Sequence, residues 1–264
     1  MSGTIKDSRA IVTGGVQGIG FQLCRHLLIK GAKMVAIFDI DQSAGQEATN
    51  KLNQEFGQGR SIFFATDVAN SNELENSFKK AVQKLGGLEI VINNAGILDS
   101  AVWSLMIDIN VKGVVQGTLL GIDYMGKHKG GKGGTIINTG SIAPFMKESF
   151  SPIYASTKAA VVTFSRFMGN YYEKTGVAVK SICPGLVITN LAMNMPSKCL
   201  EYVDKEQAQA LIDAPGLEPK DIAPAVMQLI EDPSNNAAWV KMTEYPTSTV
   251  KFAEIPDSLI PLDL

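Results

Sequence analysis

The chain has 264 residues, 45% hydrophobic and 19% charged, with a formal net charge of −2; this balance fits a large α/β domain and offers nucleic acid or an anionic membrane no attraction. No apolar run approaches the roughly 18 residues of a membrane span, and Met1–Asp7 lacks the order of a signal peptide. Three separated cysteines and two histidines argue against a disulfide framework, a metal site and a Ser-His-Asp hydrolase, and favour a reducing, cytoplasmic location.

Short runs rich in Val, Ile and Phe alternate along the chain with longer stretches of helical spacing. The predicted strands are Arg9–Thr13, Met34–Phe38, Ser61–Ala65, Glu89–Asn93, Thr135–Thr139, Ala178–Ile182 and Ala238–Thr243. The predicted helices are Gly18–Lys30, Ala44–Phe56, Asn72–Leu85, Leu105–Lys127, Tyr154–Lys174 and Pro219–Glu231. Because the strands lack polar alternation and are separated by helices, they predict a parallel sheet buried on both faces. The expected fold is α/β, a single-domain doubly wound (Rossmann) sheet of about seven parallel strands with helices on both faces, over residues 1–264.

A glycine-rich turn follows the first predicted strand. The sequence Thr13–Gly20 reads Thr-Gly-Gly-Val-Gln-Gly-Ile-Gly and leads directly into a predicted amphipathic helix. In this setting Gly14, Gly18 and Gly20 permit a tight turn, a close approach to a pyrophosphate and close helix–strand packing. The helix N-terminus presents free N–H groups to the phosphates. This order of strand, turn and helix predicts a nucleotide site.

An acid stands at the end of the second predicted strand, nineteen residues after Gly20. Asp39 can accept hydrogen bonds from a ribose 2′-hydroxyl and repel a 2′-phosphate, so it favours NAD over NADP. The alternative, a helix-capping acid, fits Asp41 better. No Arg follows Gly14 in the turn or Asp39 at the strand end, where a 2′-phosphate would need one. Asp67 and Val68, after the third strand, are candidates to meet the adenine ring, although an acid that begins a loop explains Asp67 nearly as well.

A second group of polar residues follows the later strands: Asn93–Gly96, Ser141 and Tyr154–Lys158. Tyr154 and Lys158 are four residues apart on a predicted helix and therefore share a face. A free phenol has a pKa near ~10, and we expect the ammonium and a positively charged nicotinamide to lower it toward neutrality. Tyr154 would then act as a general base for alcohol oxidation and as an acid in reverse. A pair of this kind taken alone is more often a core tyrosine beside a surface lysine.

These motifs together resemble those of the short-chain dehydrogenases/reductases. Thr13–Gly20, Asn93–Gly96, Ser141 thirteen residues before Tyr154, Tyr154–Lys158 and Pro184–Thr189 occur in the order and at the spacings of that family. The resemblance covers essentially the whole chain, and no member of the catalytic set is missing. It implies an NAD-dependent alcohol dehydrogenase with the Rossmann fold.

The resemblance also implies roles for single residues. The residue matching Ser141 binds the substrate oxygen, the one matching Tyr154 transfers the proton, and the one matching Lys158 holds the ribose and lowers the tyrosine pKa. The residue matching Asn110 keeps a water in the proton relay. The positions expected to contact the cofactor are Gly14, Gln17, Gly18, Ile19, Gly20, Asp39, Asp67, Val68, Asn94, Ala95, Gly96, Tyr154, Lys158, Pro184, Gly185, Val187 and Thr189.

Two related groups within the family share further segments with this chain. Ala95–Asp99 and Thr157–Val162 resemble insect-type alcohol dehydrogenases, whereas Gly117–Met125 and Leu229–Asp232 resemble NAD-linked 15-hydroxyprostaglandin dehydrogenases equally well. The prostaglandin enzymes carry a substrate-contacting Gln three residues before the catalytic tyrosine. Here that position is Ser151, whose shorter side chain leaves the specificity open.

Residues 190–216 occupy the place of a substrate lid. The residues expected to contact the substrate are Ser141, Ser151, Trp103, Leu191, Met193 and Met195. Methionines suit an adaptable apolar pocket, although packing of a surface helix against the core would explain the lid residues as well, and a core or interface position would explain Trp103. No Arg or Lys occurs within residues 190–197 to bind a carboxylate. We therefore expect a small apolar secondary alcohol or its ketone as substrate.

The tail, residues 247–264, carries Phe252, Ile255, Leu259, Ile260 and Leu262, which favour docking over solvation. In the family such tails pack on a neighbour or close over the site, and the long helices build homodimers or homotetramers.

Two alternatives to the NAD-dependent dehydrogenase stay open at this stage. An NADPH-dependent carbonyl reductase is opposed by Asp39. A non-catalytic NAD-binding regulatory protein is opposed by the complete set of Asn110, Ser141, Tyr154 and Lys158.

Overall fold

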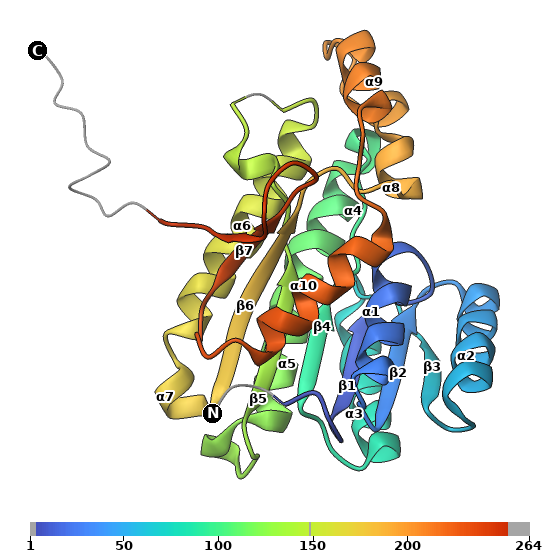
Figure 1. Cartoon of the computed structure of the whole chain (residues 1–264), viewed down its shortest axis with the longest axis vertical. Coiled ribbons are helices and arrows are strands. Elements are labelled where there is room, and N and C mark those ends of the chain that lie inside the picture. The colour runs from blue at the N-terminus through green and yellow to red at the C-terminus, as the bar shows by residue number, and fades with distance from the viewer. Residues whose placement is uncertain (1–3, 148, 253–264) are drawn as a thin grey trace, which may run out of the picture.

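The structure is a computed structural model that describes residues 4–147 and 149–252. In these ranges the strands form one sheet of eight in the order β3-β2-β1-β4-β5-β6-β7-β8 (Figure 1). The strands are β1 (Arg9–Thr13), β2 (Met34–Asp39), β3 (Ser61–Ala65), β4 (Ile90–Asn93), β5 (Gly134–Thr139), β6 (Val177–Pro184), β7 (Ala238–Lys241) and β8 (Ser248–Thr249). The first seven pair in parallel. The order reverses beside β1, so the carboxyl ends of β1 and β4 flank a crevice, the usual ligand site of such sheets.

The expected doubly wound α/β fold is confirmed, with one added strand. Strand β8 pairs antiparallel with β7, Trp239 opposite Thr249 and Val240 opposite Ser248. Two residues are too few to give a period-two pattern, so the sequence did not indicate this strand. Strand β7 also ends at Lys241, two residues earlier than predicted.

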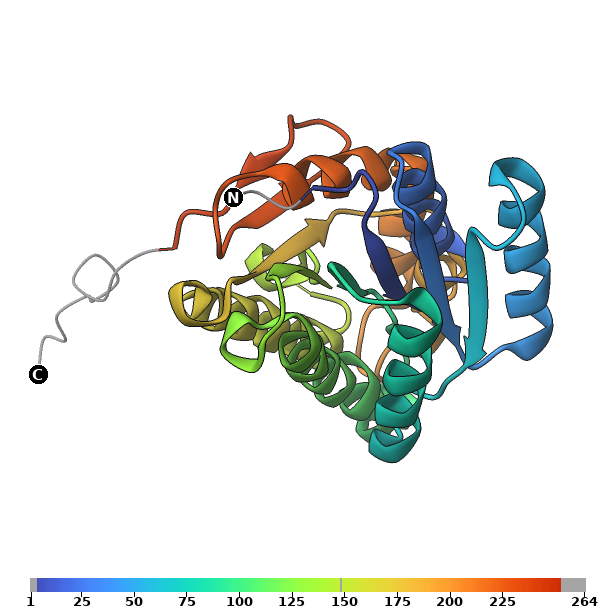
Figure 2. The same ribbon diagram turned by 90° about the horizontal axis from the view of Figure 1, so that it is seen from below.

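Helices cover both faces of the sheet (Figure 2). One face carries α1 (Gly18–Ile29), α2 (Gln42–Phe56) and α10 (Pro219–Glu231), whose apolar sides share one core cluster with the strands. The other carries α3 (Ser71–Leu85), α5 (Val114–Met125) and α6 (Pro152–Gly169). The parallel strands are thereby buried on both faces, as their apolar composition predicts.

Two predicted helices are divided in the structure. Residues 105–127 contain the end of α4 (Trp103–Ile107), a π-helical turn (Asp108–Gly113) and α5. The segment predicted as Tyr154–Lys174 begins earlier, at Pro152, because proline at the first helical position needs no N–H partner, and it ends at Gly169 before α7 (Tyr172–Thr175). Short 3₁₀ turns occupy Ser100–Val102, Lys127–Lys129, Ala143–Phe145 and Met195–Lys198.

The helical stretch Ser100–Met125 is long and apolar enough, by length and composition alone, to cross a membrane. Of its most apolar window, 44% is buried inside the protein. A core helix of a folded domain passes the same test, so this stretch is weak evidence for a span.

Residues 190–216, which were predicted to be a substrate lid and are called the lid segment below, lie at the carboxyl ends of the strands, at the top of Figure 1. It contains α8 (Asn190–Met193) and α9 (Lys205–Asp213). Its buried side chains Met195, Ala208 and Ile212 form a cluster with Leu98 from the segment after β4. Of the tail, Phe252 packs against the cluster of Val162, Cys183 and Ala238. The other apolar tail residues expected to dock, Ile255, Leu259, Ile260 and Leu262, lie outside the described residues.

Candidate active site

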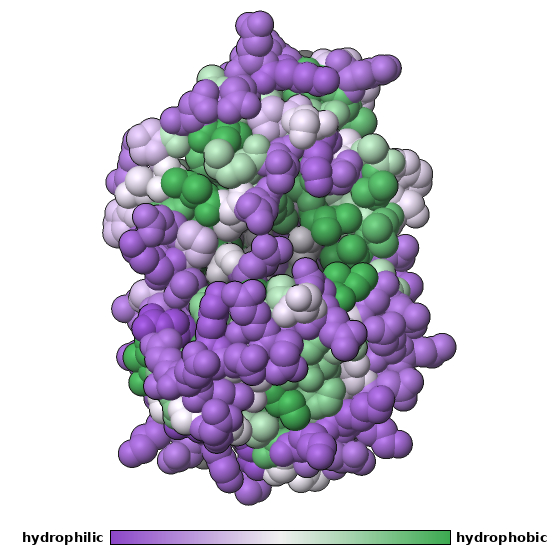
Figure 3. All heavy atoms as spheres, turned by 90° about the vertical axis from the view of Figure 1, so that its right-hand side faces the viewer, coloured by the Kyte–Doolittle hydropathy of each residue, from purple (hydrophilic) through white to green (hydrophobic). Residues whose placement is uncertain are grey.

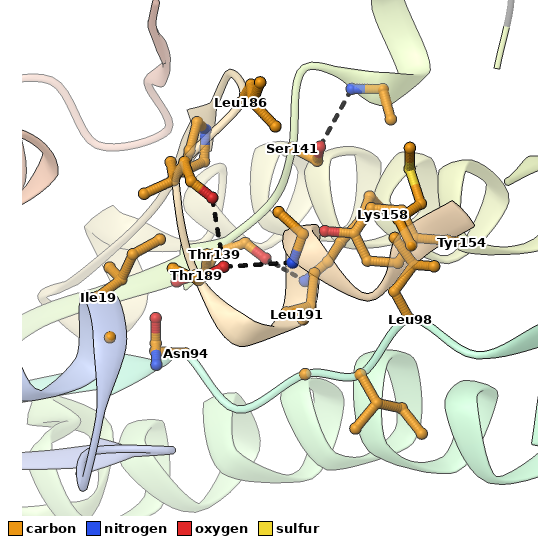
Figure 4. A pocket seen from close by; sticks show the side chains of 18 of the residues that line it. Ile19, Asn94, Leu98, Thr139, Ser141, Tyr154, Lys158, Leu186, Thr189 and Leu191 are labelled. Carbon is orange, nitrogen blue, oxygen red and sulfur yellow. Dashed lines mark hydrogen bonds between the residues drawn. The ribbon is translucent and has the colours of Figure 1, made fainter. Parts of the chain in front are cut away.

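A cavity of about 810 Å³ lies at the carboxyl ends of the strands. Its walls come from the turn after β1, the ends of β2 to β6, the start of α6 and the lid. Figure 3, which views the molecule from its right-hand side, shows apolar side chains gathered around a hollow. Figure 4 shows Ile19 and Asn94 at one end of the cavity and Leu98 and Tyr154 at the other.

The glycine-rich turn forms one end of this cavity. Gly14 and Gly18 have φ of 64° and 53°, where a side chain would be strained. A Cβ on Gly20 would lie 1.9 Å from the carbonyl oxygen of Gly14, so no larger residue fits. Helix α1 begins at Gly18 without a side-chain cap, which leaves its first N–H groups available to an anion.

Asn94 holds this turn against β4. Its side-chain amide donates to the carbonyl oxygens of Thr13 at 3.2 Å and Gly14 at 3.1 Å. The Thr13 hydroxyl in turn accepts from the backbone N–H groups of Asn94 and Ala95. The motifs after β1 and β4, eighty residues apart in sequence, thus form one rigid unit beneath the cavity.

Asp39 lines the cavity beside the turn. Its carboxylate accepts from the N–H of Val16 at 3.5 Å and of Asp41 at 3.3 Å. Burial raises the pKa of Asp39, and the backbone donors oppose that rise. Asp41 caps α2 by accepting from the N–H of Ala44 at 2.9 Å. The capping role, which fitted Asp41 better than Asp39 in the sequence, therefore belongs to Asp41.

The charges around the cavity are few. Within the part of the chain that the structure describes, Lys158 is the one Lys or Arg that lines it, and the acids are Asp39, Asp67 and Glu244. Asp67 also accepts from the N–H of Ala69 at 2.9 Å. It therefore both stabilises the start of the loop after β3 and lines the cavity.

Tyr154, Lys158 and Ser141 meet at the other end of the cavity. Helix α6 places Tyr154 and Lys158 one turn apart, with the ammonium 5.6 Å from the centre of the phenol ring. The Lys158 Nζ donates to the carbonyl oxygen of Thr139 at 2.8 Å. Ser141 Oγ accepts from the N–H of Ala143 at 3.1 Å.

Without a bound cofactor the ammonium alone does not lower the pKa of Tyr154, and the part of the expected fall that was ascribed to the nicotinamide stays a prediction. Burial raises the pKa of Tyr154 to about 12, against the opposing hydrogen bond with Ser141. Burial likewise lowers the pKa of Lys158 to about 8. Desolvation is the largest cause in both cases, because burial penalises the charged form of each group.

Asn110 lies behind the cavity wall and is fully buried. It belongs to the π-helical turn that interrupts the long helical segment, a feature that occurs frequently at functional sites. Its side-chain oxygen accepts from the N–H of Ile97 at 2.9 Å, and its amide nitrogen donates to the Ile97 carbonyl at 2.9 Å and to Thr157 Oγ1 at 3.1 Å.

The residues expected to contact the cofactor all line this one cavity. The segment after β6 contributes Pro184, Gly185, Val187 and Thr189, and Thr189 also caps α8. Across the opening, Asn190 Nδ2 donates to Gln17 Oε1 at 3.3 Å, which joins the lid to the glycine-rich turn.

The predicted substrate residues divide into two sets. Ser151, Leu191 and Met195 line the cavity with Ser141, and the buried Ser151 hydroxyl has no hydrogen-bond partner among the described residues. Trp103 and Met193 do not line it. Trp103 is 54% exposed because it begins α4 on the outer surface, and Met193, at the end of α8, is 49% exposed.

Several wall residues were missed by sequence reasoning. They are Leu98, Thr139, Met146, Phe150, Leu186, Ile212 and Met242–Glu244. Met242–Glu244 directly follow β7, and the rule that ligands bind at strand carboxyl ends would have found them. Phe150 carries no pattern that separates a cavity wall from a core position.

Three comparisons with known proteins bear on this site. The family model described as short chain dehydrogenase matches residues 8–200. The chain belongs to the short-chain dehydrogenase family. This confirms the expected family and its enzyme class.

Sequence alignments with two named dehydrogenases cover nearly the whole chain. The 15-hydroxyprostaglandin dehydrogenase [NAD(+)] of Mus musculus is 37% identical over 240 residues, 89% of each chain. Alcohol dehydrogenase 1 of Ceratitis cosyra is 28% identical over 240 residues, 90% of this chain and 92% of the other. Both groups named by the sequence resemblance are therefore found among the relatives.

Solved structures support the fold. Levodione reductase superposes with a TM-score of 0.75 at 22% identity, covering 86% of this chain and 92% of the other. A short-chain dehydrogenase from Burkholderia phymatum in complex with NAD gives a TM-score of 0.74 at 21% identity, covering 86% of each chain.

Proposed function

We propose that this short-chain dehydrogenase interconverts an apolar secondary alcohol and its ketone with NAD as cofactor and Tyr154 as general base. The observation that carries the proposal is the convergence of Ser141, Tyr154 and Lys158 on one cavity that also contains the glycine-rich turn and Asp39. When bound, NAD supplies the hydride acceptor for alcohol oxidation.

The cavity walls fit a dinucleotide. The carbonyl of Gly14 leaves no room for a Cβ on Gly20, so this part of the wall is bare backbone. We expect a pyrophosphate to bind there, at the uncapped start of α1. Asp39 keeps lone pairs free for ribose hydroxyls. Since the described wall residues include no cation near Asp39, a 2′-phosphate would meet an acid without a counter-charge. This favours NAD over NADP and opposes the carbonyl-reductase alternative.

The protein residues then divide the chemistry. Ser141 binds the substrate hydroxyl and orients it toward Tyr154, which removes the hydroxyl proton. Lys158 holds the ribose hydroxyls and lowers the phenol pKa through its charge. Asn110 supports a proton path behind Lys158. A regulatory protein that binds NAD without turnover would not need these four side chains together at the cavity, so their presence favours an enzyme.

The substrate end of the cavity favours an uncharged apolar alcohol. Its wall includes Leu98, Phe150, Leu191 and Met195, and the acid Glu244 lies at the same cavity. Glu244 would repel a carboxylate-bearing substrate, and the one described cation of the wall, Lys158, already donates to the Thr139 carbonyl. We therefore take the reaction type, but not the substrate, from the relatives named 15-hydroxyprostaglandin dehydrogenase.

The enzyme is proposed to act in the cytoplasm as a homodimer. Large apolar side chains are exposed on α5, on α6 and just before α7. They include Leu119, Phe167 and Tyr171, whose exposed fractions are 47%, 54% and 58%. Such a surface suits association with a second copy.

The experiment is alcohol-dependent reduction of NAD by the wild type and by Tyr154→Phe. We expect turnover with an apolar alcohol class in the wild type alone. Turnover by both proteins would remove Tyr154 from its role, and tight NAD binding without turnover on any alcohol would favour the regulatory alternative.

A further inference from the structure

The amide of Asn110 is held by three hydrogen bonds, and two of them go to a single backbone residue. Ile97 supplies the N–H that donates to Oδ1 and the carbonyl that accepts from Nδ2, both at 2.9 Å. The second Nδ2 proton goes to Thr157 Oγ1 at 3.1 Å. Because Asn110 is fully buried, loss of the Thr157 hydroxyl would leave this Nδ2 proton without its partner in the protein, which costs free energy.

Thr157 reaches Asn110 from the catalytic helix. It lies in α6 between Tyr154 and Lys158 and is 3% exposed. Its hydroxyl donates to the carbonyl oxygen of Tyr154 at 2.7 Å and accepts from Asn110 at the same time. One hydroxyl thus joins the π-helical turn to the backbone of the residue that carries the phenol.

The position of Asn110 relative to α6 sets the spacing of the site. A Cβ built on Gly96 would lie 3.2 Å from Asn110 Oδ1 and 3.4 Å from Lys158 Nζ, so both groups lie close to Gly96. A shift of the π-helical turn against α6 therefore changes the distance between Asn110 and Lys158. Displacements of this kind reduce turnover even when every reacting group is present.

We propose that Thr157 is a positioning residue that fixes Asn110 against the catalytic helix and thereby maintains the proton path through Tyr154 and Lys158. The proposal rests on the proposed function, because it assigns a role within that reaction. Thr157 does not line the cavity and acts through Asn110.

The test compares Thr157→Val with Thr157→Ser. Valine keeps the shape of threonine but removes the hydroxyl, whereas serine keeps the hydroxyl. Thr175→Val is the matched control, since Thr175 is also buried and donates to a backbone carbonyl, that of Tyr171 at 3.0 Å, but lies in α7 outside the cavity wall.

We expect Thr157→Val to lower kcat about tenfold or more and to shift the pH profile of kcat to higher pH, with KM and NAD affinity nearly unchanged. Thr157→Ser should restore both quantities, and Thr175→Val should leave them as in the wild type. In the free protein, hydrogen exchange of the Ile97 amide should be faster in Thr157→Val, because its acceptor on Asn110 is no longer fixed.

A Thr157→Val enzyme with wild-type kcat, pH profile and Ile97 exchange would overturn the proposal. Equal impairment of Thr157→Ser, or the same kinetic loss in Thr175→Val, would assign the effect to general destabilisation and overturn it too. If the wild type oxidises no alcohol, the proposed function fails, and Ile97 exchange alone still decides whether Thr157 fixes Asn110.

Discussion

Lys158 lies with its ammonium 5.6 Å from the ring centre of Tyr154 while it donates to the carbonyl of Thr139 at 2.8 Å. Both groups are desolvated, so burial raises the pKa of Tyr154 to about 12 and lowers that of Lys158 to about 8. The phenol is therefore protonated at neutral pH in the protein by itself. Its use as a base requires further positive charge beside it, which a bound oxidised cofactor provides.

Replacing Lys158 by Met should raise the apparent pKa of the base in alcohol oxidation. The loss of a cation at this distance is expected to move the rise in kcat with pH by about one unit or more to the alkaline side. The pH profile of kcat at saturating NAD measures it. Lys158→Arg, which keeps the charge, is the control and should shift the profile less; identical profiles in the wild type and Lys158→Met would contradict this role.

Asp39 should set the choice of cofactor. Asp39→Asn removes a charged acceptor for the ribose hydroxyls, which is worth about 1.5–3 kcal/mol, so the ratio of kcat/KM for NAD over NADP should fall roughly tenfold or more. Asp41→Asn is the neighbouring control. Asp41 caps α2, and asparagine caps helices about as well as aspartate, so this variant should leave both the thermal stability and the cofactor ratio nearly unchanged. Equal ratios in the wild type and Asp39→Asn would exclude Asp39 from this role.

The sequence was sufficient where local spacing decides the geometry. Tyr154 and Lys158 are four apart on a helix and meet on one face, and the glycines before α1 form the turn that their order predicts. It was insufficient where tertiary packing decides. Trp103 was expected in the substrate pocket, but α4 presents it to the surface.

The electrostatics of the site follow the same division. The spacing predicts the cation beside Tyr154. The burial that raises the pKa of Tyr154 depends instead on segments from elsewhere in the chain that cover the phenol. The Thr157–Asn110 contact joins residues 47 positions apart and has no sequence signal.

A buried lysine outside the cavity should make folding stability depend on pH. Lys180 on β6 donates to the carbonyls of Leu229 at 2.7 Å and Asp232 at 2.6 Å, and burial lowers its pKa from 10.5 to about 8. Between these pH values the unfolded chain binds the proton and the folded chain does not. The contribution of Lys180 to stability is therefore lowest below about pH 8 and rises toward pH 10.5.

Urea unfolding of the wild type and Lys180→Met measures this effect. The difference in unfolding free energy should move in favour of the wild type as pH increases through this range. Lys158 titrates in the same range but is present in both proteins, so its effect cancels in the difference. Replacement of the exposed Lys174 by Met is the control. A difference for Lys180→Met that is constant with pH would contradict the expectation.

Glu244 should disfavour anionic substrates. A hydroxy fatty acid and its methyl ester form a matched pair that differs chiefly in charge, and the ester should have the higher kcat/KM. Glu244→Gln should reduce this preference, and added salt should reduce it in the wild type because Glu244 is exposed. If the wild type prefers the acid, the proposed class of uncharged substrates is wrong.

NADH formation at mildly alkaline pH tests directly whether hydride is transferred to NAD with Tyr154 as the base. Wild type and Tyr154→Phe are assayed with NAD⁺ and NADP⁺ on short alcohols, terpenoid alcohols, steroids and hydroxy fatty acids. We predict turnover with NAD⁺ on an apolar class of alcohols, reduced roughly a hundredfold or more in Tyr154→Phe, with NAD binding retained. Undiminished turnover in Tyr154→Phe would contradict it.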